Sequence, residues 1–207
     1  MSIKSRQVAG VTSLVVLIVA ALSAYHLATL ARMELQESKS RGDMLLAAIY
    51  QRARDVVPGA EDPYTALEED DGIRRLLESA FGFSPNVTYA AIVDKDGKAI
   101  AHNSRTEEGQ SIPEQEDLSD ILDRNSFSVL RAVFLSERTY EMRQPLLFGD
   151  QDQQFGSIRI GISTLLVKSD LREAFGLALW HIAIALVVST IVSMLLAQWM
   201  LRPIHVI

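Results

Sequence analysis

The stretch VTYAAIVDKDGKAIAH, residues 87–102, holds two apolar segments on either side of a tight turn. Val87 to Asp94 is rich in β-branched and aromatic residues, and Lys98 to His102 is a second, shorter apolar segment. The turn between them contains Asp96-Gly97, a pair that favours the backbone of a short hairpin loop. The stretch therefore predicts an antiparallel β-hairpin and, with it, a domain built on a sheet.

Further elements are predicted on both sides of this hairpin. The segment from Arg32 to Val57 places apolar residues among charges and has no proline, which predicts a long helix. Asp70 or Asp71 would cap a second helix over Ile73 to Ala80. A polar loop from Asn103 precedes an acidic helix over 115–124. Three strands follow, over 127–135, 138–148 and 155–163, and then a last helix over 164–175. Helices followed by a five-stranded antiparallel sheet predict an α+β fold.

Two long runs without any Asp, Glu, Lys or Arg flank this domain, Val8–Ala31 and Gly176–Leu201. Each exceeds the roughly 20 residues that an α-helix needs to cross the hydrocarbon core of a bilayer. Lys4 and Arg6 before the first run would also suit a secretory signal peptide, but the apolar core of a signal is only about 7–15 residues long. Two transmembrane helices are therefore predicted, the first an uncleaved anchor.

The charged residues are distributed unevenly around the two runs. All 26 acidic residues lie between them, with all but three of the 20 basic ones, Lys4, Arg6 and Arg202. Short basic flanks stay in the cytoplasm, whereas a long loop is translocated largely regardless of its charge. The prediction is a two-pass protein with both termini cytoplasmic: stub 1–7, spans 8–31 and 176–201, exterior domain 32–175 and stub 202–207. An acidic exterior domain also argues against nucleic acid as a partner.

Two stretches of the exterior domain resemble a known family. They are YAAIVDKDGKAIAHNSRTEEGQSI (89–112) and MRQPLLFGDQDQQFGSIRIGIS (142–163), and they are similar to the two hairpins of the extracytoplasmic PAS-like sensors called Cache or PDC domains. The resemblance extends over most of residues 40–170. It implies a long N-terminal helix with a five-stranded antiparallel sheet, and a homodimer in the bacterial inner membrane with the domain in the periplasm.

The last residues, WMLRPIHVI (199–207), resemble the start of a HAMP linker, which joins membrane helices to cytoplasmic output domains in bacterial receptors. Proline suits the first turn of a helix and breaks a continuing one, so Pro203 would reset the helix axis at the membrane exit. Arg202 would lie at the headgroup level. Arg202 and Pro203 are therefore expected to transmit the signal, although any membrane helix can end in Arg-Pro.

Several residues are candidates for binding a small ligand. By the resemblance, His102 stands where related sensors hold a carboxylate, and Arg143 where they keep a basic residue. Alternation along the predicted strands places Arg143 and Arg159 on the polar face of the sheet, and an Arg fork grips a carboxylate with two hydrogen bonds. Arg131, on the predicted strand 127–135, and Arg105, in the polar loop, complete the set. Glu141 would repel an anion, and solvated charges and an exposed loop histidine remain alternatives.

Other chemistry finds little support in the sequence. The acidic clusters at 61–71 and 114–123 lack the ligand spacing of a calcium loop, so solvated acids are favoured over a cation site. No nucleophile elbow, phosphate-binding glycine loop or paired-histidine motif occurs. We expect no catalytic residue, metal or cofactor in these residues. Small residues recur every four positions in both apolar runs and predict helix-packing seams: Ala20, Ala24 and Ala28; Ala185, Ser189, Ser193 and Ala197.

These observations predict the input module of a transmembrane sensor that passes a signal from a small exterior ligand, such as a carboxylate or an amino acid, through the second span. By the resemblance, the output is a histidine kinase with its response regulator in a two-component system, ahead of a chemoreceptor or a cyclic-dinucleotide enzyme. A different class stays open, in which a membrane-anchored scaffold binds another protein through the acidic exterior domain.

Overall fold

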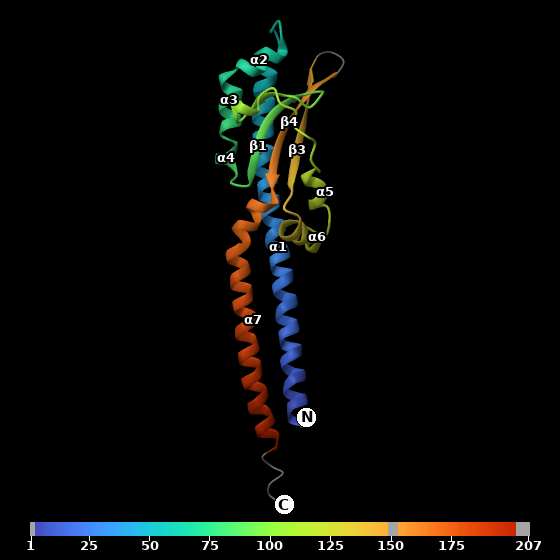
Figure 1. Ribbon diagram of the computed structural model, residues 1–207, viewed down its shortest axis with the longest axis vertical. Helices are drawn as coiled ribbons and strands as arrows, with labels where there is room; N and C mark the ends of the chain where they lie inside the picture. The colour runs from blue at the N-terminus through green and yellow to red at the C-terminus, as the bar shows by residue number, and fades with distance from the viewer. Residues whose placement is uncertain (1–2, 149–152, 202–207) are drawn as a thin grey trace, which may run out of the picture. The chain divides into compact units, whose positions relative to one another are not determined.

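The computed structural model describes residues 3–148 and 153–201. The chain divides into a helical unit, Met1–Leu30 with Leu171–Ile207, and a sheet-bearing unit, Ala31–Asp170. Two long helices, α1 (Ile3–Val56) and α7 (Thr164–Leu201), each have one part in either unit. The strands and the short helices around them belong to the sheet-bearing unit (Figure 1).

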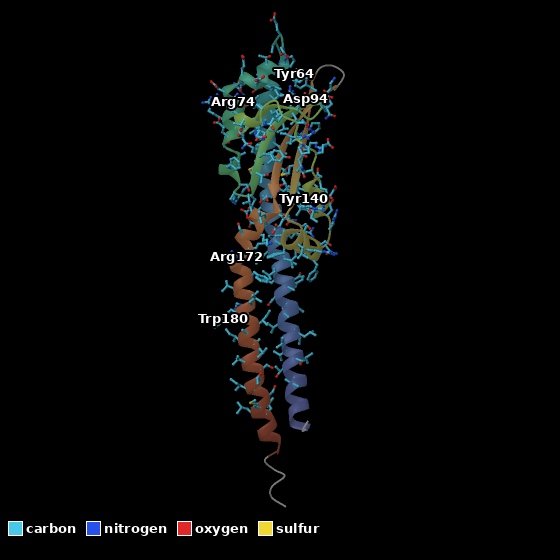
Figure 2. The ribbon with its side chains drawn as sticks, viewed as in Figure 1. Tyr64, Arg74, Asp94, Tyr140, Arg172 and Trp180 are labelled. Atoms are coloured by element: carbon cyan, nitrogen blue, oxygen red, sulfur yellow. The ribbon has the colours of Figure 1, made fainter. Side chains whose placement is uncertain are left out.

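Both long helices contain a segment that is long and apolar enough to cross a membrane. The expected packing stripes lie in these segments. Ala28 is fully buried and Ser189 and Ser193 are nearly so, whereas Ala20, Ala24 and Ala185 are half-buried. Trp180 on α7 is exposed (Figure 2). The side chain of Ala197, and all of Arg202 and Pro203, lie outside the described residues.

The sheet is antiparallel, with the strand order β2-β1-β4-β3. Its strands are β1 (Val87–Asp94), β2 (Ala99–His102), β3 (Thr139–Phe148) and β4 (Gln153–Ser163). The predicted hairpin is β1–β2, and Gly97 supplies the positive φ of 81° that its turn requires. Asp94 holds that turn, because its Oδ1 accepts the backbone N–H groups of Asp96 and Lys98 at 2.9 and 2.8 Å.

Within the described ranges the sheet has four strands, so the prediction of five is wrong. The segment predicted as strand 127–135 forms the helix α6 (Ser126–Arg131) and the π-helical turn η2 (Ala132–Ser136). Asn125 caps α6 by accepting the N–H of Ser128 at 2.8 Å. The buried residues of the segment, Val129, Ala132 and Val133, follow helical spacing and leave Arg131 exposed. A short run of β-branched and aromatic residues does not by itself distinguish a strand from a buried helix.

One face of the sheet is apolar and packs on α1. Ile158, Ile160 and Met142 point to this face and are buried. Gly42 of α1 lies against Met142, since a Cβ at position 42 would overlap its sulfur. The α1 residues on the same side are fully buried or nearly so: Leu35, Leu45, Leu46 and Ile49. In β4 the residues of both faces are buried from Gly156 to Ser163, so the predicted alternation appears in the direction of the side chains and not in their burial.

Short helices close the edge of the sheet beside β2. They are α2 (Pro63–Glu69), α3 (Asp71–Glu78) and α4 (Ala80–Phe83). Asp62 caps α2 and Asp70 caps α3 through the N–H of Ile73 at 2.8 Å. Asp70 also receives two hydrogen bonds from Arg52 of α1, which lower the pKa of its carboxyl. The Asp70 cap thus also joins α3 to the long helix α1.

The second face of the sheet is polar and is crossed by the loop 103–117. This loop contains the short 3-10 turn η1 (Arg105–Glu107) and leads into α5 (Leu118–Leu122). It is attached to the sheet at two places: a β-bridge pairs Ser111 with Lys98, and the backbone N–H of Glu141 donates to the carbonyl oxygen of Glu116 at 2.8 Å. The loop is therefore a fixed cover over the polar face.

Candidate functional site

The polar face of the sheet carries a row of residues that the sequence singled out. Cross-strand pairing places His102 beside Ala91, Ala91 beside Arg159, and Arg159 beside Arg143. Three of the candidate ligand residues thus share one row across all four strands. Arg105 is exposed in η1 and Arg131 is exposed on α6, so these two do not join the row.

A cavity of about 620 Å³ lies under the loop 103–117 at the His102 end of this row. Tyr89 and His102 line it from the sheet, and Phe81 lines it from α4. Most of the remaining wall consists of hydroxyl and amide side chains: Thr88, Asn103, Ser104, Gln110, Ser111, Gln115 and Thr139. Glu107 is the one charged side chain among the described residues that line this cavity. The cavity therefore offers hydrogen bonds rather than positive charge.

His102 is buried, and its Nδ1 lies 2.9 Å from the backbone nitrogen and 3.2 Å from the carbonyl oxygen of Ser104. In the tautomer whose Nδ1 accepts the N–H of Ser104, Nε2 carries the proton. Burial lowers the pKa of the imidazole below its usual value, although the hydrogen bond with the Ser104 backbone and the nearby Glu107 and Glu108 act in the opposite direction. At neutral pH His102 is therefore uncharged and can donate one hydrogen bond from Nε2.

Tyr89 stacks near His102, with ring centroids 6.2 Å apart, and lies across Gly161 of β4. A Cβ at position 161 would overlap the Tyr89 ring, so glycine is needed there. The Tyr89 hydroxyl is buried and has no hydrogen-bond partner among the described residues. Burial, together with the negative charge of Glu141, raises the pKa of this hydroxyl, which stays protonated.

Arg159 and Glu141 form a buried ion pair under the other half of the loop. Arg159 Nε lies 3.2 Å from Glu141 Oε1, and the exposed fractions of the two side chains are 6% and 1%. Arg159 Nη1 also donates to the carbonyl oxygen of Ile112 at 3.1 Å, and Glu141 Oε2 accepts the N–H of Gln115 at 3.0 Å. The pair therefore pins the loop to the sheet. Oε1 of Glu141 has no hydrogen-bond partner in the described part of the chain, so its contact with Arg159 is ionic.

Arg143 extends the same ionic cluster towards solvent. Its Nη2 donates to Glu141 at 3.3 Å and its Nη1 to Glu114 at 3.2 Å. Glu114 also lies 3.5 Å from Arg159. Two arginines thus face two glutamates, and neither arginine lines the cavity beside His102. The arginine fork expected for a carboxylate is already occupied by the protein's own carboxylates.

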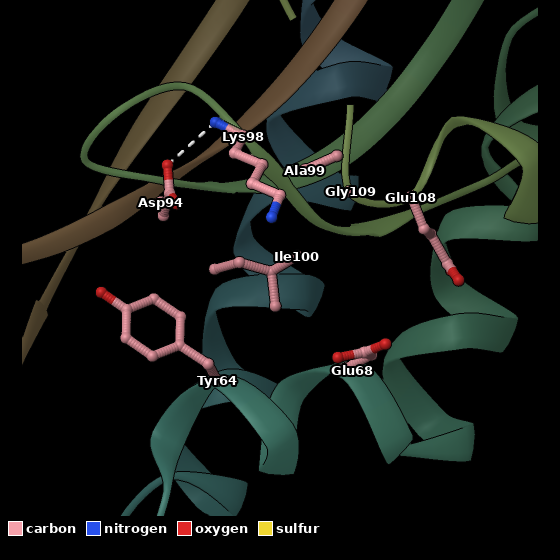
Figure 3. Close-up of a pocket in the computed structure, with 8 residues that line it drawn as sticks. All are labelled: Tyr64, Glu68, Asp94, Lys98, Ala99, Ile100, Glu108 and Gly109. Atoms are coloured by element: carbon pink, nitrogen blue, oxygen red, sulfur yellow. Dashed lines mark hydrogen bonds between the residues drawn. The ribbon is translucent and has the colours of Figure 1, made fainter. Parts of the chain in front are cut away.

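A second cavity, of about 410 Å³, lies between α2 and the β1–β2 hairpin. Tyr64 and Glu68 line it from α2, while the Lys98 side chain points into it from the hairpin (Figure 3). Of its other carboxylates, Asp94 holds the hairpin turn and Glu108 pairs with Arg74 at 3.0 Å. Because these groups already stabilise the fold, the cavity beside His102 is the better ligand site.

The sequence indicated part of this site and missed the rest. His102 is a candidate because of its place at the end of the hairpin, whereas neither Tyr89 nor Gln110 is among the candidates from the sequence. No local pattern marks a residue of a covering loop as part of a cavity wall. In the described ranges no group of three His, Cys, Asp or Glu side chains could hold a metal ion.

No family model matches the sequence, and no curated protein matches it. Solved structures do match, among them an "Extracellular ligand binding receptor from Desulfohalobium retbaense DSM5692". The alignment has 14% sequence identity and a TM-score of 0.45, and it covers 72% of this chain and 26% of the receptor chain. The chain thus spans about a quarter of the length of that receptor, and a likeness of this degree assigns no family.

Proposed function

We propose that the chain is the input part of a membrane receptor whose sheet-bearing unit senses a small ligand outside the cytoplasm. The proposal is carried by the cavity of about 620 Å³ beside His102, whose wall is formed in part by a polar loop that is attached to the sheet. Small-molecule sites commonly have volumes of about 300–1,000 Å³ and a few convergent polar groups. The two apolar helices support attachment to a membrane.

The wall of this cavity favours a polar ligand without net negative charge. An anion would meet Glu107 and no lysine or arginine among the described lining residues. An amine or a polyhydroxylated compound would find Glu107 and the amide oxygens as acceptors, and His102 Nε2 as a donor. An amino acid could bind through its ammonium group, whereas a dicarboxylate lacks a partner.

Binding in the cavity would act on the start of α7. Thr139 lines the cavity and follows Arg138, whose backbone N–H and C=O both hydrogen-bond to the hydroxyl of Thr164 at 2.9 Å. Thr164 is fully buried and is the first residue of α7. A ligand that moves Thr139 would therefore shift the population between two positions of α7.

The signal would then pass along α7 to Arg202 and Pro203 and into a HAMP-like linker. By the resemblance to Cache sensors, the receptor is a homodimer in the bacterial inner membrane, and a histidine kinase is the first candidate for its output. These parts of the proposal rest on the sequence resemblance alone.

Thermal-shift screening of the full chain in nanodiscs tests the ligand class. The panel contains amines, polyols, amino acids and carboxylates. A ligand present at 100 times its Kd should stabilise the protein by about 2.7 kcal/mol. We expect a stabilising compound without net negative charge, and loss of its effect in His102→Ala and Gln110→Ala.

Arg143→Ala serves as the matched control, because Arg143 lies on the same sheet face but outside the cavity wall. A carboxylate whose effect is lost in Arg143→Ala but kept in His102→Ala would place the site among the arginines and contradict the proposal. If no compound of the panel has an effect and the sheet-bearing unit captures a specific protein, the scaffold function is favoured instead.

A further inference from the structure

The segment from Arg124 to Ser136, which contains the predicted strand 127–135, differs in charge from the rest of the sheet-bearing unit. The sheet-bearing unit is acidic, yet the segment from Arg124 to Ser136 contains two arginines and no Asp or Glu. Neither Arg124 nor Arg131 has an acidic partner among the described residues. The segment therefore carries a net positive charge on an acidic unit.

Large apolar side chains stand on the outer side of the same segment. Phe127 is 53% exposed and Leu135 is 75% exposed, with the exposed Arg131 between them at helical spacing. The inner side of the helix is buried, so α6 and η2 are firmly seated on the domain and still present an apolar outer face. Isolated exposed apolar residues are ordinary, but two of them in register with an arginine form an amphipathic surface.

This surface lies where α1 leaves its apolar run. Arg32 directly follows the uncharged run 8–31, so chain continuity places it at the outer boundary of the predicted span. Its Nη1 donates to the carbonyl oxygen of Arg124 at 3.0 Å, one residue before the cap of α6. Figure 1 likewise shows α6 at the end of the sheet-bearing unit where α1 enters it. The amphipathic surface is thus joined to Arg32, the residue that directly follows the uncharged run.

We propose that the outer face of α6 and η2 docks on the exterior surface of the membrane. Phe127 and Leu135 insert into the interfacial layer, while Arg124 and Arg131 contact anionic lipid headgroups. Helices that bind this interface combine exposed Phe or Leu side chains with basic residues on the neighbouring polar face, and each basic residue near an anionic surface adds about 1 kcal/mol. The inference rests on the proposed membrane insertion of α1, and not on the ligand.

The test uses the full chain in nanodiscs, and it benefits from the absence of cysteine, because each new cysteine is a unique labelling position. A nitroxide is attached to Phe127→Cys, Leu135→Cys, or the control Met44→Cys, and its accessibility to oxygen and to a water-soluble nickel chelate is measured. Met44 is a matched control because it is 62% exposed and lies twelve residues beyond Arg32 on α1, about 18 Å along the helix.

In bilayers containing phosphatidylglycerol we expect the labels at positions 127 and 135 to be more accessible to oxygen than to the nickel chelate. The label at position 44 should be more accessible to the nickel chelate. Replacing phosphatidylglycerol by phosphatidylcholine, or combining Arg124→Gln with Arg131→Gln, should lower the oxygen preference at 127. A label at Leu17→Cys reports insertion of the span itself. If the label at position 17 contacts lipid but the labels at 127 and 135 are accessible to the water-soluble chelate, this inference alone is overturned. If the label at position 17 is also accessible to the chelate, the membrane insertion of α1 is overturned as well.

A second copy of the chain is the other possible occupant of this surface, and the same labels distinguish it. Positions 127 and 135 would then be shielded from both probes in lipid-free detergent and would show spin–spin coupling. That result contradicts docking on lipid. Independence of the 127 signal from both lipid charge and the arginine substitutions would also contradict the assigned role of Arg124 and Arg131.

Discussion

Individual residues of the polar sheet face have roles that depend on which neighbours the fold brings to them. Arg143 and Arg159 carry the chemistry of an anion site, but Glu141 and Glu114 neutralise them. His102 carries the chemistry of a titrating switch, but burial lowers its pKa and favours the neutral ring. The free hydrogen-bonding capacity of this face therefore belongs to the cavity beside His102.

The pKa of His102 predicts a pH dependence of stability. Because the folded-state pKa is lowered, only the unfolded state takes up a proton as pH first falls below about 6.5. The stability that His102 contributes is thus complete above that pH and decreases below it, by at most about 1.4 kcal/mol per pH unit. Denaturation of wild type and His102→Gln at pH values above and below this point should show a smaller loss in the variant. Parallel losses would contradict the prediction.

Removing Arg159 should be costly because it leaves Glu141 charged and buried. We expect Arg159→Met to lower the free energy of unfolding by about 3 kcal/mol. The matched substitution Arg143→Met should cost no more than about 1 kcal/mol, since 35% of that side chain is exposed. Chemical denaturation of both variants measures the difference, and equal effects would show that burial of the ion pair does not set its energy.

At the scale of elements, the decisive feature is the segment between α5 and β3. Its β-branched and aromatic residues satisfy a strand pattern, but the Asn125 cap and inward-facing Val129, Ala132 and Val133 make it a helix followed by a π-helical turn. The turn ends at Glu137, whose φ of 37° reverses the chain into β3. The change from strand to helix also moves Arg131 from the sheet to the outer surface.

The close packing of β1 on β4 predicts a strong effect at Gly161. An added Cβ would overlap the Tyr89 ring and the Thr88 hydroxyl, so Gly161→Ala should destabilise the protein by about 1–3 kcal/mol. Gly82→Ala is the control, because nothing lies within 4 Å of a Cβ there. Thermal denaturation compares them. Tolerance of Gly161→Ala equal to that of Gly82→Ala would mean that Tyr89 does not lie across β4 in solution.

At the scale of the whole molecule, the important feature is how the sheet-bearing unit is connected to the two apolar helices. Both ends of the sheet-bearing unit continue as helices into apolar segments. A ligand in this unit could act on the apolar helices only through the ends of the unit, and hydrogen bonds join Thr164 to Arg138, the neighbour of the cavity residue Thr139.

The topology predicts which residues are accessible from outside the cell. A cysteine at Lys98, exposed on the hairpin turn, should react with a membrane-impermeant maleimide in intact cells with a permeable outer envelope. A cysteine at Ser2 should react only after the inner membrane is opened, because the basic stub is expected to stay inside. Labelling of position 98 only after lysis would place the sheet-bearing unit in the cytoplasm and would contradict the sensor proposal.

Much of the fold could be predicted because its signals are local. The β1–β2 hairpin follows from Asp96-Gly97 between apolar segments, α3 from its Asp70 cap, and α1 from an uninterrupted helical pattern. The site could be predicted only in part. His102 stands at the end of a recognisable strand, whereas Gln110 and Ser111 reach the cavity through the path of a loop, which no periodicity encodes.

The sequence alone therefore determined the apolar helices, the α+β class, the hairpin and the alternation that gives the sheet one apolar and one polar face, because each depends on neighbours a few residues apart. Only the tertiary structure decided that residues 126–136 are helical, that Glu141 neutralises Arg159, and that the open space lies beside His102. These outcomes depend on contacts between residues far apart in the chain. Their energies are set by burial and by the partners that folding brings together.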